Sequence, residues 1–179
     1  MEADVNLAIK KANEKRELYN PDNVSPFPFE NIERGRKDLE IIYTNLLEDK
    51  ISGAISYNKD NDSFSIYINR SKPKTRQYFT VAHELGHLFL HSEFIKSEEI
   101  MIDGEGTLDG GRTLFRLDDA IGTKLEIEAN NFAASLIMPE DLVRDAWGKV
   151  GDVKECAEIF NVSVVAMAIR LEKLGLAND

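Results

Sequence analysis

All three histidines of this 179-residue chain, at positions 83, 87 and 91, fall within one predicted helix that runs from about residue 74 to 91. Histidines four residues apart project from the same face of a helix, one turn above the other. That spacing lets the imidazoles of His83 and His87 reach one metal ion at about 2.0–2.1 Å each. Glu84 lies at the edge of the same face, where it can take a proton from water without being a ligand. The pattern predicts a metal centre with two histidine ligands and Glu84 as general base.

Zinc suits such a centre because it accepts nitrogen and oxygen ligands and lowers the pKa of water from about 15.7 to about 7. We expect one zinc ion. His91 is excluded as a further ligand beside His83, because the two lie about 12 Å apart along a helix. A pair made of His87 and His91 would put Leu88 where the base belongs. We interpret His91 as a residue of the helix C-terminus, where a partly protonated imidazole favours the negative end of the helix dipole.

The third ligand must come from another element, and the predicted helix 123–138 offers Glu126 and Glu128. At 100° per residue, Glu126 shares a small, apolar face that suits close packing against another helix. A carboxylate on such a face needs compensation, which a metal ion provides, although a salt bridge at the helix edge is the alternative. Glu128 lies on a more polar side, and we interpret it as a solvated surface charge. Asn130, one turn beyond Glu126, either orients a ligand histidine or merely packs.

The charge of the chain limits the classes of partner that it can bind. The chain has 22 Lys and Arg residues against 32 Asp and Glu, a formal charge of −10, which argues against direct binding to nucleic acid or to an anionic membrane. The charge suits a basic protein partner. A single cysteine, Cys156, can form no internal disulfide. The first residues lack the apolar run of a signal peptide, and no stretch approaches the roughly 18 apolar residues of a membrane span. We therefore expect the protein in the cytoplasm.

The remaining pattern predicts an α+β chain. Strands are expected at 39–43, 51–57 and 63–69, the last two forming a hairpin around the turn 58–62. The glycine-rich segment 92–122 is expected to be mobile or to form a hairpin. Helices are expected at about 4–18, 28–36, 74–91, 123–138, 140–147, 152–160 and 163–174.

Two runs, RQYFTVAHELGHLFLH (76–91) and EIEANNFAASLIMP (126–139), resemble the ImmA/IrrE metallopeptidase family, and AEIFNVSVVAMAIRLEKLGL (157–176) is similar to its tail. The resemblance implies a zincin-like minimal metalloprotease fold, in which a small three-stranded sheet packs on the active-site helix and a helical portion follows. The length of the chain suits a single domain over 1–179, which we divide into an N-terminal helical segment (about 1–38), a core (39–138) and C-terminal helices (139–179). The resemblance also implies a gluzincin-like site, with His83, His87 and Glu126 as ligands and Glu84 as the base.

The same resemblance implies an endopeptidase that relieves repression by cutting a helix-turn-helix transcriptional repressor of a phage, mobile element or stress response. The alternative is a regulatory module that keeps the peptidase fold and zinc but sequesters its partner. The intact Glu84 favours the first, since a module that only binds has no need of a base.

Three groups of residues remain open from the sequence. Residues 153–174 have the pattern of a helix-turn-helix, but their positive and negative charges are balanced. This favours a role in packing over DNA binding. An oxyanion-stabilising group cannot be chosen among Tyr57, Tyr67, Tyr78 and Arg170. The strand Ser63 to Asn69 leads almost directly into the histidine helix. If it is a sheet edge, we expect it to capture an extended peptide as an added strand.

Overall fold

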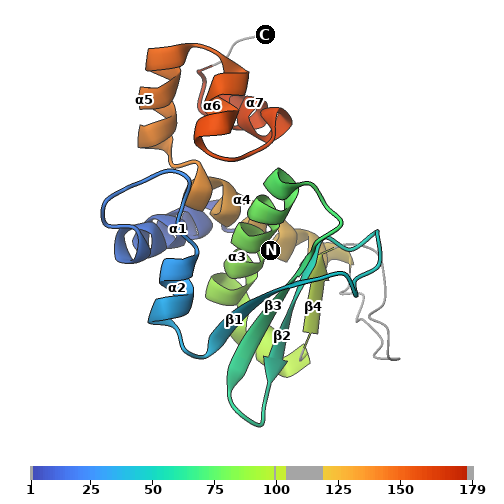
Figure 1. Ribbon diagram of the computed structural model, residues 1–179. Coiled ribbons are helices and arrows are strands. Elements are labelled where there is room, and N and C mark those ends of the chain that lie inside the picture. The colour runs from blue at the N-terminus through green and yellow to red at the C-terminus, as the bar shows by residue number, and fades with distance from the viewer. Residues whose placement is uncertain (1, 99, 104–118, 177–179) are drawn as a thin grey trace.

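The computed structural model describes residues 2–98, 100–103 and 119–176. A helical N-terminal segment is followed by strands around one long helix and then by four more helices (Figure 1). The helices are α1 (Val5–Tyr19), α2 (Glu30–Gly35), α3 (Lys74–Glu98), α4 (Asp119–Ile137), α5 (Glu140–Val150), α6 (Val153–Ile159) and α7 (Val164–Lys173). The strands are β1 (Leu39–Thr44), β2 (Gly53–Asn58), β3 (Ser63–Asn69) and β4 (Ile100–Asp103).

The four strands form one sheet in the order β1-β3-β2-β4. The predicted hairpin of β2 and β3 is confirmed, and β1 adds to β3 in parallel. The sheet has one strand more than the three expected, because β4 pairs antiparallel with β2. This strand comes from the segment 92–122, whose residues 104–118 lie outside the described part of the chain. Four residues are too few for their alternation to predict a strand.

The position of β3 overturns one expectation. This strand is hydrogen-bonded to β1 on one side and to β2 on the other, so its backbone groups are already paired. It is not a sheet edge and cannot take up a peptide as an added strand. A hairpin pattern tells which two strands pair, but not on which side a third strand joins. Among the described strands the edges are β1 and β4.

The long helix α3 packs on one face of this sheet. Register places Gly53, Ile55, Ile66 and Ile68 on a common face, and Gly53 meets Thr80 of α3. The three isoleucines are fully buried there. Helix α4 packs against α3, and α1 packs against α4. The core therefore consists of the sheet, α3 and the α1–α4 pair.

Helices α5 to α7 lie together at one end of the molecule, away from the sheet (Figure 1). Each begins at a cap that the sequence provides: Pro139 precedes α5, while Asp152 and Ser163 accept hydrogen bonds from the first turns of α6 and α7. No described helix combines the length and apolar character that a bilayer span requires.

Candidate metal centre

Helix α3 brings two histidine side chains together as the four-residue spacing predicts. His83 and His87 are both buried, and their Nε2 atoms lie 3.0 Å apart. The rings meet edge to face, with centroids 4.6 Å apart. Two nitrogen atoms that can each bind a metal thus point at the same place.

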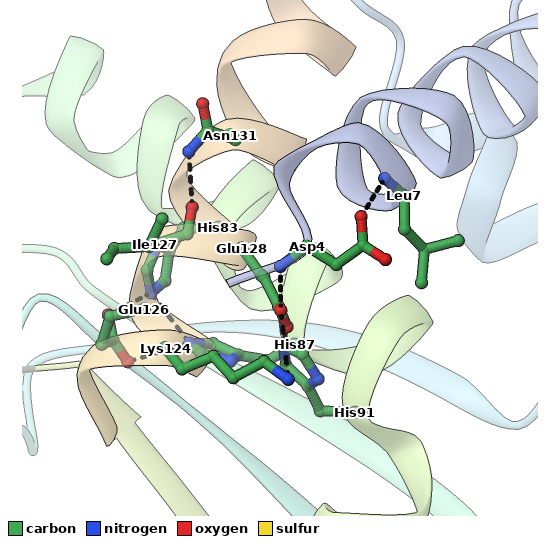
Figure 2. A network of polar contacts seen from close by, with 10 residues as sticks. All are labelled: Asp4, Leu7, His83, His87, His91, Lys124, Glu126, Ile127, Glu128 and Asn131. Atoms are coloured by element: carbon green, nitrogen blue, oxygen red, sulfur yellow. Dashed lines mark hydrogen bonds and ion pairs between the residues drawn. The ribbon is translucent and has the colours of Figure 1, made fainter. Parts of the chain in front are cut away.

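A carboxylate from α4 completes the group. Glu126 Oε2 lies 3.2 Å from His83 Nε2, and Glu126 Oε1 lies 3.2 Å from His87 Nε2. Of the two glutamates considered on this helix, it is Glu126 that joins the histidines (Figure 2). Its side chain is 40% exposed while both histidines are almost fully buried, so the carboxylate faces the open side of the group.

The three ligand atoms fit a cation of zinc's size. The two histidine nitrogens are 3.0 Å apart, and each lies 3.2 Å from a different oxygen of Glu126, distances close to the roughly 3.3 Å between two ligands of a tetrahedral ion with bonds of about 2.05 Å. Burial lowers the pKa of His87 to about 4, which keeps its imidazole neutral at neutral pH. Burial opposes ionisation of Glu126, but its contacts with His83 and His87 outweigh this and hold its pKa below the usual range. Neutral imidazole and ionised carboxylate are the forms that bind metal.

Asn130 contacts one of the two buried histidines. Its side-chain oxygen lies 3.1 Å from Nδ1 of His83. A carbonyl oxygen only accepts, so Nδ1 carries the hydrogen and Nε2 is left with its lone pair toward the group. This contact is compatible with Asn130 orienting a histidine, a role that stays a prediction.

A glycine allows α3 and α4 to approach closely enough for this geometry. A Cβ placed on Gly86 would meet both the Cα and the carbonyl oxygen of Ala129 at 3.0 Å. Ala129 lies one turn after Glu126, and Gly86 directly precedes His87. This close contact of the two helices therefore lies next to His87 and one turn from Glu126.

Glu84 is fully buried between α3 and the sheet. A Cβ on Gly53 of β2 would lie 2.9 Å from Glu84 Oε1 and 2.4 Å from the methyl group of Thr80. The glycine thus makes the space that the carboxylate occupies. The sequence analysis missed Gly53 and the packing role of Gly86. A signal existed for Gly86, because a glycine inside a helix costs about 1 kcal/mol relative to alanine and asks for a packing reason.

The position of His91 agrees with its prediction, whereas Glu128 differs from its own. His91 is a buried, non-helical residue with φ −129° and ψ 24°, at which the first helical part of α3 ends and a second part begins that runs to Glu98. Burial lowers its pKa, contrary to the partly protonated state expected. Glu128 is 7% exposed and is no solvated surface charge. The N-terminal segment covers this side of α4, and Asp4 donates its backbone N–H to Glu128 (Figure 2).

The structure does not gather the candidates for an oxyanion-stabilising group around the histidines. Tyr67 pairs in register with Ala54, so it points to the sheet face opposite Gly53 and α3. The hydroxyl of Tyr78 donates to the carbonyl of Phe27, and burial raises its pKa. The other two side chains have distinct partners: Tyr57 donates to Asp62, and Arg170 donates to the carbonyl of Met138.

Comparison with known proteins adds a family. Residues 34–172 match the family model described as IrrE N-terminal-like domain, Peptidase_M78. Metallopeptidase ImmA of Bacillus subtilis (strain 168) is 28% identical over 126 residues, which cover 69% of this chain and 64% of that protein. An uncharacterized immunity region protein 2 of Bacillus phage phi105 is 34% identical over 101 residues, covering 54% of this chain and 51% of that protein. The chain thus spans about half to just under two thirds of the length of these curated relatives.

Among solved structures, a Mycobacterium tuberculosis transcriptional regulator is similar with a TM-score of 0.60 at 16% identity. The likeness covers 91% of this chain and 47% of that chain. At this level of identity it concerns the fold alone.

Proposed function

Because the chain belongs to the IrrE N-terminal-like family of peptidases, Peptidase_M78, we propose that it is a zinc-dependent endopeptidase of the gluzincin type, with zinc held by His83, His87 and Glu126. One observation carries the proposal: two buried imidazole nitrogens and a carboxylate converge within 3.0–3.2 Å of one another. Two such nitrogens and an ionised carboxylate provide the ligand set of a catalytic zinc site, which keeps a fourth position open.

Glu84 acts as the general base. When bound, zinc supplies a Lewis acid that polarises the scissile carbonyl and makes water more acidic. The Glu84 carboxylate accepts a proton from the attacking water and passes it to the nitrogen of the leaving amine, so the peptide bond breaks as the new C–O bond forms. Asn130 holds His83 in the tautomer that leaves Nε2 free. Because Gly53 has no side chain, there is room beside it for the carboxylate of Glu84 that accepts this proton.

The substrate that we propose is a bacterial or phage transcriptional repressor of the helix-turn-helix class, cleaved in the cytoplasm. Support comes from the ImmA/IrrE resemblance and from a phage immunity-region relative. The formal charge of −10 favours a basic partner over nucleic acid itself. Cleavage is expected in a flexible or locally unfolded segment, because a folded helix does not present an extended peptide.

The ligand set is tested by metal analysis of purified variants. Glu126→Gln removes the charged ligand and is expected to lower zinc occupancy by at least tenfold. Glu140→Gln removes a carboxylate whose ion pair with Arg144 is exposed on α5, and zinc content should stay at the unsubstituted level. Equal zinc content in the two variants would remove Glu126 from the site.

The substrate is tested by incubating the zinc-loaded protein with a purified helix-turn-helix repressor from the same genome and analysing the products by mass spectrometry. One cut in the repressor is expected, with loss of operator binding. A repressor that stays whole, binds this protein tightly and leaves its operator would show sequestration instead of proteolysis.

A further inference from the structure

Glu128 is a buried carboxylate that the proposed chemistry does not use. Its Oε1 accepts the backbone N–H of Asp4 at 2.7 Å and lies 3.6 Å from Nζ of Lys124. Its Oε2 lies 3.5 Å from Nε2 of His91, an electrostatic contact somewhat longer than a hydrogen bond. Figure 2 shows these groups meeting between the start of α1, the kink in α3 and the middle of α4.

Stability alone does not account for a carboxylate at this place. Burying a charge costs several kcal/mol unless partners compensate it, and apolar residues of similar volume often replace such a network without loss of stability. A buried charge that contacts α1, α3 and α4 is better explained if its contacts fix the spacing of these three helices.

The network lies beside the metal ligands on both helices that carry them. Glu128 follows Glu126 by two residues on α4, and His91 follows His87 by one turn on α3. The rings of His87 and His91 are in contact, with centroids 5.7 Å apart. A shift of the Glu128–His91 contact therefore moves ligand-bearing turns of both helices.

The N-terminal helix takes part through this network. Helix α1 is bound to α4 by polar contacts at two points: Asp4 reaches Glu128 near its start, and Arg16 donates to the carbonyl of Leu136 at 2.8 Å near its end. Between them, the fully buried Ala8 and Ala12 let α1 and α4 approach closely. The first of the two points is the one next to the metal ligands.

We propose that Glu128 and His91 are positioning residues of the metal centre, and that docking of the N-terminal segment on Glu128 sets the spacing of α3 and α4 at the ligands. This inference rests on the proposed function, because it assumes that the three ligands hold a metal ion. According to this inference, helix α1 contributes to the metal centre although α1 itself supplies no ligand.

The test compares two substitutions at one position. Asp4→Ala keeps the backbone N–H that Glu128 accepts and removes only the side-chain cap, which accepts from Leu7. Asp4→Pro removes both the cap and the N–H. The difference between the two variants isolates the bond to Glu128. Glu128→Ala is the direct variant, and circular dichroism checks that each variant folds.

Two readouts follow the metal itself: zinc affinity by competition with a chelator, and the visible spectrum of the cobalt-substituted protein. We expect Glu128→Ala to weaken zinc binding by about tenfold, the lower end of what lost outer-sphere partners cost. Asp4→Pro should bind zinc several-fold more weakly than Asp4→Ala and show an altered cobalt spectrum. Asp4→Ala should match the unsubstituted protein in both.

Equal zinc affinities and cobalt spectra for the two Asp4 variants would overturn the inference and leave the proposed function intact. If the unsubstituted protein binds neither zinc nor cobalt, the proposed metal site is wrong, and so is the positioning role. Metal binding without peptide cleavage would contradict the peptidase proposal alone, since both readouts here are independent of turnover.

Discussion

Protonation and tautomer decide what the three converging side chains can hold. A neutral His87 and an ionised Glu126 present a lone pair and a negative charge, and Asn130 orients His83 to do the same. In the metal-free protein, His87 Nε2 can instead carry its hydrogen and donate it to His83 Nε2 at 3.0 Å. At this scale, the helical spacing predicted the histidine pair from the sequence, whereas the helical phase of Glu126 left a salt bridge open and the family resemblance completed the group.

Gly53 provides the sharpest test at the residue scale. Gly53→Ala places a methyl group 2.9 Å from Glu84 Oε1, so the carboxylate must move. We expect kcat to fall by about 100-fold, the cost of a displacement of about 1 Å in a reacting group. Zinc content should not change, because no ligand contacts this methyl group.

A second substitution separates stability from positioning. The same methyl group meets the methyl of Thr80 at 2.4 Å, and overpacking of this kind costs about 1–3 kcal/mol. Adding Thr80→Ser removes that clash and should recover stability, measured by urea unfolding, without recovering kcat. Full activity of Gly53→Ala would show that Glu84 does not need this space.

The elements bring the ligands together by close packing. α3 carries the histidines, α4 carries Glu126, and the two meet closely at Gly86 and Ala129. Sequence periodicity predicted both helices, but it did not predict the burial of Glu128, which depends on where α1 docks. Nor did it predict the central place of β3, because the side on which β1 joins is set by tertiary packing. The short β4 carries too little pattern to be recognised.

Two glycines that lie within helices allow a substitution and its control to be compared at the scale of the elements. Gly86→Ala pushes a methyl group to 3.0 Å from the backbone of Ala129, whereas Gly148→Ala in α5 meets nothing within 4 Å. Gly148→Ala should stabilise the protein by about 0.5–1 kcal/mol through helix propensity. Gly86→Ala should destabilise it by about 1–3 kcal/mol and weaken zinc binding, since α4 must move away with Glu126.

Urea unfolding and zinc titration of both variants check this pair. If the Gly86→Ala variant is as stable as the Gly148→Ala variant and its zinc affinity is unchanged, the contact of α3 and α4 does not control the ligand spacing.

At the scale of the whole molecule, the candidate metal centre lies between α3 and α4, and the start of α1 binds α4 two residues further along. Helices α5 to α7 form a separate group, whose predicted role as a packing element and not a DNA reader stays a prediction (Figure 1). The fold class was accessible from the sequence, largely because two motif-bearing runs lie on the two helices that form the centre.

Global stability of the metal-free protein is expected to fall as the pH is lowered from 6.5 toward 4. His87 has a folded pKa of about 4, depressed by burial from 6.5, so in this window the unfolded chain binds more protons than the native one. Stability therefore rises with pH, by up to about 3 kcal/mol across the window. Urea unfolding in the presence of a chelator measures this, and His87→Gln should flatten the dependence. An equally steep dependence in that variant would assign it to other groups.

Hydrolysis of a repressor substrate by zinc-loaded protein, measured side by side for the unsubstituted chain and Glu84→Gln at equal zinc content, tests the central proposal most directly. Glutamine keeps the size of Glu84 but cannot accept the proton of the attacking water. The account predicts specific cleavage by the unsubstituted protein and a loss of at least about 1000-fold in the variant, with fold and zinc content unchanged. Comparable cleavage by both proteins would contradict it.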